Sequence, residues 1–196
     1  KFNTVGSRRT YTRPDGKSVT VSGGDYGWKV DSASLAGQLS QAVLAGQVVT
    51  LDVPVLQSGN GFSGLGAQDW GSRYVDVDLS QQHARFYDGG KVIWESPIVS
   101  GAPNDGRSTP QGVYDLNSKG KNVTLVGSDA DHDGKPDYET KVTFWMPFKG
   151  NSIGFHDANW QSSFGGQRYR QGYGSHGCIN LPYGKAESLY GVIKTG

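Results

Sequence analysis

The turn Asp88-Gly89-Gly90 is the feature that most constrains how this chain can fold. It separates two runs with strand character, Ala84–Tyr87 and Lys91–Trp94. Glycine adopts positive φ angles without a steric cost, and the tight hairpin turns that match the twist of paired strands require such angles. Just upstream, Tyr74–Leu79 alternates polar and apolar residues, as a strand with one buried face does. The sequence therefore predicts antiparallel β structure from residue 74 onward.

The rest of this region continues the pattern and ends in a helix. Further short strands are predicted at Val113–Asn117, Val123–Val126, Lys141–Phe148 and Ser152–His156. Tyr183–Ile193 has helical spacing of its apolar residues and should pack behind the preceding loop. Many short strands with one late helix are typical of a sandwich or barrel. The predicted fold class is mainly β: an antiparallel β-sandwich or barrel-like domain with a late helix, preceded by a small α+β domain.

The first 70 residues predict that small α+β domain. Arg8–Thr12 and Ser18–Ser22 have strand character on either side of the turn Pro14-Asp15-Gly16. Asp31 can cap a helix that Gly46 ends, and Val48–Val55 then predicts another strand. The apolar positions of this helix, at helical spacing, are Leu35, Leu39, Ala42 and Val43.

The stretch 57–72 is glycine-rich and is the best candidate for a linker. We therefore expect two domains, 1–70 and 71–196.

Composition narrows the classes of function. The 19 basic residues nearly balance the 18 acidic residues, which argues against a nucleic-acid partner or a polybasic membrane face. No run approaches 18 apolar residues, so we expect no membrane contact by this stretch of chain. The chain begins at Lys1 rather than Met, and we expect it to be a processed or excised fragment. A single cysteine excludes an internal disulfide.

That cysteine, Cys178, lies in the string Ser175-His176-Gly177-Cys178-Ile179-Asn180, and His156 lies 22 positions upstream. A lone cysteine with a sequence-distant histidine is the minimal set for a cysteine acyl-transfer enzyme. A thiol with a pKa of roughly 8.5 needs a base or a cation beside it to react at neutral pH. His156 can act as general base or as the imidazolium partner of a thiolate. His176 is only two residues from Cys178 and is better placed to shape the pocket.

The neighbouring residues suggest supporting roles. Backbone N–H groups of Gly177 and Cys178, with His176 as a further candidate, would form an oxyanion hole. Asp157 would orient His156 through its carboxylate or its backbone carbonyl, since adjacent side chains on a strand point to opposite faces. Loop-fixing hydrogen bonds are expected from Ser175 and Asn180. Four residues between His156 and Cys178 either line the substrate cleft or are ordinary loop residues: Arg168, Tyr169, Arg170 and Tyr173.

The pattern of His156, 18 further residues and the string Ser175–Asn180 resembles the signature of the L,D-transpeptidase catalytic domain. Upstream, Val99-Ser100-Gly101 followed by Ser108–Tyr114 is similar to the TP-x-G segment of that family. The resemblance covers about residues 73–195. It implies a β-sandwich-like enzyme that cross-links bacterial peptidoglycan through a cysteine acyl-enzyme, without a metal or an organic cofactor.

The resemblance also implies substrates and location. Cys178 would attack the carbonyl of the third residue of a tetrapeptide stem, release D-alanine, and pass the acyl group to an amine of a neighbouring stem. Carbapenem-type β-lactams would acylate the same thiol. The expected location is extracytoplasmic, in the cell wall, with the full-length protein membrane-anchored or secreted. Two alternatives remain: an L,D-carboxypeptidase, in which water is the acceptor, and a non-catalytic peptidoglycan-binding protein.

Two other stretches carry weaker signals. Acidic residues at Asp129, Asp131, Asp133 and Asp137, with Gly134, resemble the front of an EF-hand calcium loop. Thr140 stands where the bidentate Glu is needed, so a solvated hairpin loop with an exposed His132 is the favoured interpretation over a metal site. The first 70 residues are similar to part of a domain, thought to bind peptidoglycan, that often precedes L,D-transpeptidase domains; a simple spacer is the alternative. His83 is expected to be structural.

Overall fold

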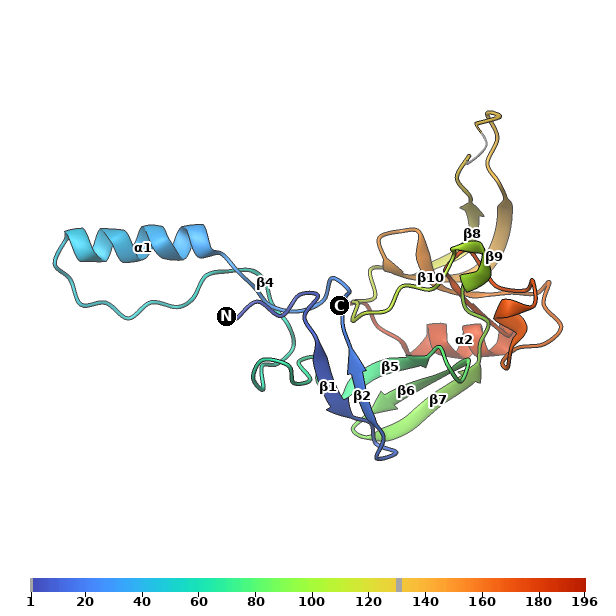
Figure 1. Ribbon diagram of the computed structural model, residues 1–196, viewed down its shortest axis with the longest axis horizontal. Coiled ribbons are helices and arrows are strands. Elements are labelled where there is room, and N and C mark those ends of the chain that lie inside the picture. Colours follow the sequence, from blue (N-terminus) through green and yellow to red (C-terminus); the bar gives the residue numbers. More distant parts are fainter. Residues whose placement is uncertain (1, 130–131) are drawn as a thin grey trace. The chain divides into compact units, whose positions relative to one another are not determined.

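The computed structural model describes residues 2–129 and 132–196, and the chain forms two compact units (Figure 1). One unit holds the chain up to Gly71 together with Gln111–Val113, and the other holds Ser72–Pro110 and Tyr114–Gly196. Gln111–Val113 joins the first unit because Val113 forms a parallel bridge with Gly24. A Cβ on Gly24 would lie 2.0 Å from the Val113 carbonyl oxygen, so this approach requires glycine.

In the second unit, the predicted hairpin is confirmed. Strands β5 (Arg73–Asp78), β6 (His83–Asp88) and β7 (Lys91–Pro97) form a three-stranded antiparallel sheet. Gly89 and Gly90 make the turn with φ angles of 55° and 80°. Both angles lie in the region that favours glycine, as the sequence required.

The second sheet of this unit has the order β11-β10-β9-β8. Its strands are β8 (Gly120–Val126), β9 (Glu139–Lys149), β10 (Ile153–Asp157) and β11 (Ile179–Leu181). The first three are antiparallel neighbours, whereas β10 and β11 are parallel. The parallel pair was not predicted, and it makes the sheet mixed.

The late helix is confirmed as α2 (Tyr183–Val192), which contacts β7, β9 and β10. Ala186 and Leu189 are fully buried in one cluster with Phe86 of β6, Met146 of β9 and Ile179 of β11. Each large side chain buried there stabilises the fold by roughly 1.5–3 kcal/mol. The fold is mainly β with a late helix, as predicted, and its core lies between the two sheets and the helix.

Two predicted strands are wrong. Val113–Asn117 forms no strand, because Val113 belongs to the first unit, where it pairs with Gly24 in an isolated bridge. Of Val48–Val55, only the last residue enters a strand, β4 (Val55–Gln57). Val48 is fully exposed and Val53 about half exposed. Because β propensity reflects packing on a half-buried surface, valines without such a surface do not form a strand.

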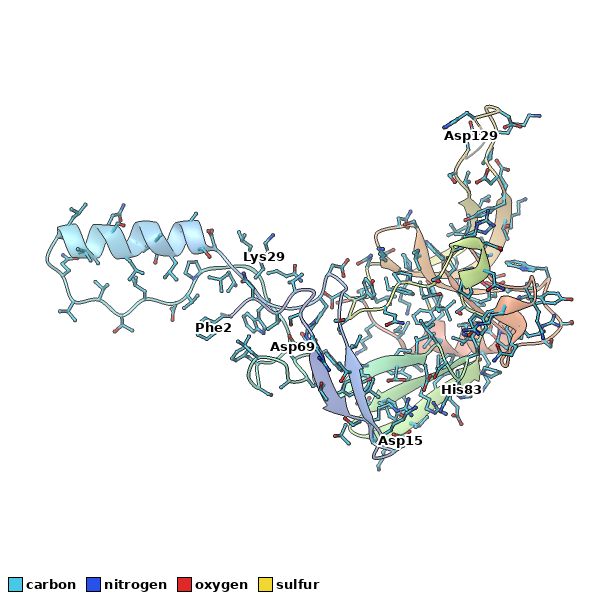
Figure 2. The ribbon with its side chains drawn as sticks, in the orientation of Figure 1. Phe2, Asp15, Lys29, Asp69, His83 and Asp129 are labelled. Atoms are coloured by element: carbon cyan, nitrogen blue, oxygen red, sulfur yellow. The ribbon has the colours of Figure 1, made fainter. Side chains whose placement is uncertain are left out.

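In the first unit, β1 (Arg9–Thr12) pairs with β2 (Ser18–Val21), and β3 (Lys29–Val30) pairs with β4. Asp31 caps the predicted helix, α1 (Ser32–Leu44), by accepting from the Ser34 N–H. The helix forms as predicted, and none of its residues is buried. The Arg9 side chain forms a buried ion pair with Asp69, which Figure 2 labels.

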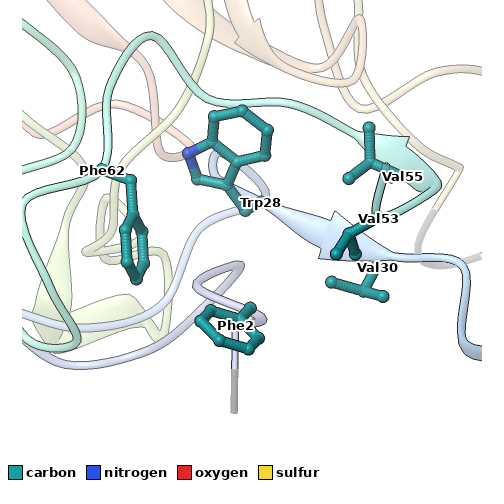
Figure 3. A pocket seen from close by; sticks show the side chains of 6 residues that line it. All are labelled: Phe2, Trp28, Val30, Val53, Val55 and Phe62. Atoms are coloured by element: carbon teal, nitrogen blue, oxygen red, sulfur yellow. The ribbon is translucent and has the colours of Figure 1, made fainter. Parts of the chain in front are cut away.

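The first unit also has an open apolar hollow of about 210 Å³ (Figure 3). Its lining residues are Phe2, Trp28, Val30, Val53, Val55 and Phe62. These side chains offer no nucleophile, acid or base, so the hollow is not a site of acyl transfer. Within residues 2–129 and 132–196, no helix combines the length and apolarity that crossing a bilayer demands.

Candidate active site

The parallel pair β10–β11 brings the predicted nucleophile and base to one face of the sheet. His156 and Asn180 are Cα partners across the pair, so their side chains share a face. Cys178 lies two residues before Asn180, and side chains two apart on an extended chain point the same way. Phe155 and Ile179, which alternate with these residues, point to the opposite face and enter the core. Continuing this register by one residue sets Cys178 opposite Gly154, two positions before His156, and on the same face as the imidazole.

The His156 ring is fixed by a backbone carbonyl. Its Nδ1 lies 2.9 Å from the carbonyl oxygen of Asp157. Because a carbonyl only accepts, Nδ1 carries the proton, and in the neutral ring Nε2 is left as the basic nitrogen. His156 is 4% exposed, and burial lowers its pKa below the usual value, while the bond to Asp157 and its charge oppose that shift.

The Asp157 carboxylate does a different task. Its Oδ1 accepts from the backbone N–H groups of Thr143 and Phe144, each at 2.8 Å. Its Oδ2 accepts from the Asn159 amide at 3.2 Å. The carboxylate therefore joins the end of β10 to β9. Of the two ways in which Asp157 was expected to orient the base, the geometry supports the backbone carbonyl.

Two tryptophans flank the His156 ring and were not identified from the sequence. The Trp145 ring on β9 lies 6.0 Å from it between centroids, and the Trp160 ring lies 5.9 Å from it. Trp145 is the Cα partner of His156 across β9–β10, a register that the sequence does not reveal. Trp160 is 55% exposed beside a buried base, which suits the rim of a cleft.

Cys178 is 6% exposed, and burial raises the pKa of its thiol to about 11, while a hydrogen bond with the Gly154 backbone opposes the rise. The thiol donates weakly to the Ser152 carbonyl, with 3.6 Å between sulfur and oxygen. A raised thiol pKa beside a lowered imidazole pKa favours the neutral form of both groups. Neutral forms of both groups are compatible with general-base activation of the thiol at the moment of attack.

The turn before Cys178 is held by Ser175. The Ser175 hydroxyl donates to the Cys178 carbonyl at 2.7 Å and accepts from the Gly177 N–H at 3.0 Å. The Gly177 N–H, expected in the oxyanion hole, is thus already engaged. Within the described residues, no acceptor meets the N–H of Cys178 or of His176. These two groups are the remaining candidates for oxyanion donors.

The structure separates the two histidines of the motif. The His176 ring is exposed and packs against the Tyr138 ring with centroids 4.7 Å apart. The His176 pKa is lowered by partial burial first and by the Arg107 charge second. Tyr138 is the last residue of the β8–β9 loop and was not identified from the sequence. His176 thus shapes the surface over the turn, and His156 is the better-placed base.

Asn180 is 3% exposed and belongs to a chain of hydrogen bonds. Its amide nitrogen donates to the Gln161 Oε1 at 3.0 Å, and the Gln161 Nε2 donates to the Tyr173 carbonyl at 2.8 Å. These bonds hold the loop after β10 against β11, in agreement with a loop-fixing role for Asn180.

The four loop residues between base and nucleophile contact one another. Arg168–Arg170 forms a 3-10 helix, the Arg168 guanidinium lies 3.5 Å from the Tyr173 ring centroid, and that of Arg170 lies 5.1 Å from the Tyr169 ring centroid. None of these interactions involves the thiol or the imidazole. Their contribution to substrate binding stays a prediction.

The acidic loop lies at the end of the β8–β9 hairpin, where Figure 2 labels Asp129. Asp129 accepts from the backbone N–H groups of Asp133 and Gly134, each at 3.0 Å. Asp131 lies outside the described residues. Among the side chains that are described, no group of three His, Cys, Asp or Glu residues is arranged to hold a metal ion. His83 pairs with Glu95 at 3.1 Å, as a structural histidine would.

Comparisons with known proteins identify the family of this chain. Residues 72–196 match the family described as YkuD, L,D-transpeptidase catalytic domain. A comparison with curated protein sequences gives no match.

Solved structures of L,D-transpeptidases are similar to the chain. The Ldtfm–avibactam carbamoyl enzyme is 35% identical with a TM-score of 0.78, over 100% of this chain and 72% of that chain. A cysteine-to-serine mutant of the Enterococcus faecium L,D-transpeptidase is 34% identical with a TM-score of 0.77. The match covers 98% of this chain and 73% of that chain. The catalytic domain of the E. faecium enzyme acylated by ertapenem is 41% identical with a TM-score of 0.55. The match covers 64% of this chain and 92% of that chain.

Proposed function

Since this chain belongs to the L,D-transpeptidase catalytic-domain family, we propose that Cys178 and His156 form 3→3 cross-links in peptidoglycan. The observation that carries the proposal is the face shared by His156 on β10 and Cys178, the residue just before the parallel strand β11, with Nδ1 of the base tied to a carbonyl. This arrangement leaves Nε2 free to take the thiol proton.

The first half-reaction makes a thioester. Cys178 Sγ attacks the carbonyl carbon of the third stem residue while His156 Nε2 takes the thiol proton. The N–H of Cys178, with that of His176, donates to the oxygen that gains negative charge. As the tetrahedral intermediate collapses, the C–N bond breaks and His156 returns its proton to the departing D-alanine amine.

The second half-reaction uses the same groups in reverse order. An amine from a neighbouring stem attacks the thioester carbonyl and loses a proton to His156. The C–S bond then breaks, the thiol regains a proton, and the new amide joins the third residues of two stems. Which acceptor completes the reaction depends on how well the cleft excludes water, since water as acceptor gives only hydrolysis.

The same thiol is proposed to react with carbapenems. The similar E. faecium catalytic domain acylated by ertapenem, at 41% identity, supports this extension. A β-lactam carbonyl presents the same electrophile to Cys178 as a stem peptide does. Because the substrate is peptidoglycan, we propose an extracytoplasmic location at the cell wall. A peptidoglycan-binding or spacer role for the first unit belongs to the same proposal.

The test is intact mass after incubation with a carbapenem and, separately, with a tetrapeptide stem. Cys178→Ala should give no adduct, and His156→Ala should slow adduct formation by roughly 100- to 10,000-fold, as expected for loss of a general base. His176→Ala is the matched control, and it should retain far more activity than His156→Ala.

The products then separate the rival activities. A tetrapeptide dimer establishes transpeptidation, whereas a tripeptide alone indicates a carboxypeptidase. Wild-type protein that is folded and reduced, yet yields neither adduct nor turnover, would leave only the binding protein.

A further inference from the structure

Thr109 holds the peptide unit that precedes the nucleophile, although it lies 68 positions away in the sequence. Its hydroxyl donates to the Gly177 carbonyl oxygen at 2.9 Å and accepts from the Gly101 N–H at 2.9 Å. Thr109 is 7% exposed, so water does not compete for these bonds. The hydroxyl proton is committed to Gly177, because the Gly101 amide only donates.

This bond fixes the direction of a second group. In a trans peptide the carbonyl and the following N–H point in opposite directions. The chain has no cis peptide among its described residues, so holding the Gly177 carbonyl also aims the Cys178 N–H. Ser175 restrains the flanking groups, the Gly177 N–H and the Cys178 carbonyl. The Cys178 N–H is left pointing away from Thr109, beside its own thiol.

Close packing keeps the peptide from rotating out of this position. A Cβ on Gly101 would lie 2.8 Å from the Gly177 Cα and 2.0 Å from the Arg107 carbonyl oxygen. Gly101 therefore lets one backbone lie directly against the other. Gly101 also forms a parallel bridge with Ser175, so this bridge and the Thr109 bond to Gly177 both join the loop that carries Thr109 to the turn before Cys178.

We propose that Thr109 is a positioning residue for the oxyanion donor: its hydroxyl holds the Gly177–Cys178 peptide so that the Cys178 N–H faces the substrate oxygen that becomes negative. Thr109 acts through this peptide and not on the reacting atoms. The inference rests on the proposed function, since an oxyanion forms only if Cys178 is acylated.

Two reactions of the same thiol test the proposal. Acylation by a carbapenem passes through an oxyanion, whereas alkylation by iodoacetamide displaces iodide at a saturated carbon and does not. Thr109→Val removes the hydroxyl at nearly constant shape, and Thr109→Ser retains it. We expect Thr109→Val to lower the limiting acylation rate by roughly 10- to 1,000-fold, with the half-saturating carbapenem concentration unchanged. Alkylation should stay within about twofold of wild type, and Thr109→Ser should restore acylation.

Each other outcome has a defined meaning. Equal acylation rates for Thr109→Val and wild type overturn the inference and leave the proposed function intact. Equal losses in acylation and alkylation also overturn it, because they show that the thiol itself has moved. Wild-type protein that is alkylated but never acylated refutes the proposed function and, with it, the inference. If Thr109→Val loses its native circular dichroism spectrum, Thr109→Ala replaces it with the same expected selectivity for acylation.

Discussion

His156 is oriented by the main chain of its own neighbour: its Nδ1 lies 2.9 Å from the Asp157 carbonyl oxygen, while the Asp157 side chain faces β9. A substitution of the side chain therefore leaves the orienting atom in place. The carboxylate of Asp157 therefore serves stability, and its backbone carbonyl serves the orientation of the base.

Asp157→Asn should keep acylation within a few-fold of wild type, because the carbonyl that holds His156 remains. It retains Oδ1, which accepts from both Thr143 and Phe144, and should cost about 1 kcal/mol of stability. Asp157→Ala leaves both N–H groups without an acceptor and should cost about 2–5 kcal/mol. Chemical unfolding and carbapenem acylation rates check both. A thousandfold loss of acylation in folded Asp157→Asn would show that the carboxylate orients the base.

The fall of the acylation rate at low pH, the acid limb of its pH profile, should report the His156 pKa. Burial lowers this pKa below 6.5, so the basic form persists and the rate should stay level until the pH falls below that value. The Asp157 charge raises the His156 pKa, so Asp157→Asn should move the limb to still lower pH. Rates between about pH 4 and pH 8 test this, since that range brackets histidine titration. A limb above pH 6.5 would contradict the burial argument.

The buried thiol should make the fold less stable in alkali. Its pKa is raised from 9.0 to about 11, so the unfolded chain loses the proton first as pH rises. The thiol's contribution is fully present below about pH 9 and is lost through about pH 11. By about pH 10.5, wild type should have lost about 2 kcal/mol relative to Cys178→Ser, which does not titrate there. Urea unfolding of both proteins at about pH 8 and pH 10.5 measures this difference. An equal change in unfolding free energy between the two pH values in both proteins would indicate a thiol with an ordinary pKa.

The first unit should depend strongly on its buried ion pair. Arg9 and Asp69 are each 1% exposed, with Nε and Oδ1 2.9 Å apart. Asp69→Asn leaves the guanidinium charge buried without its partner and should cost about 3–5 kcal/mol. The surface pair Arg73–Asp88, with side chains 39% and 42% exposed, is the control, and Asp88→Asn should cost at most about 1 kcal/mol. Hydrogen exchange at the β1–β2 amides measures the loss locally, and similar protection in both variants would contradict it.

The elements that the sequence predicts well are those determined by neighbouring residues. Asp88-Gly89-Gly90 requires only its own backbone angles, and the face of α2 follows from spacing within ten residues. The sequence singles out Cys178 and His156 as the candidate nucleophile and base, because this chemistry requires few residue types and the motif is compact. α1 forms where its cap and apolar spacing indicate a helix. Whether a helix face is buried depends on contacts that no local pattern specifies, and none of the α1 residues is buried.

What the sequence could not reveal depends on contacts between distant segments. The pairing of β10 with β11 joins strands separated by a long loop and carries no periodic signal. The hydroxyl of Thr109 gains its position from Gly177, and the Gly177 N–H is engaged because Ser175 folds back on it. Val48–Val55 failed for the opposite reason: its residue types favour a strand, but Val48, Val49 and Val53 stay largely exposed and gain no half-buried surface.

The parallel ladder between β10 and β11 has a consequence for how this site can vary. Cross-strand register pairs His156 with Asn180, two residues after Cys178, so the number of residues in the connection 158–174 does not set the position of the thiol relative to the imidazole. That connection can gain or lose residues, or change its aromatic and basic side chains, while the chemistry remains unaltered. Diversification of acceptor or donor preference can therefore proceed in the loop, independently of the machinery that breaks and forms the bond.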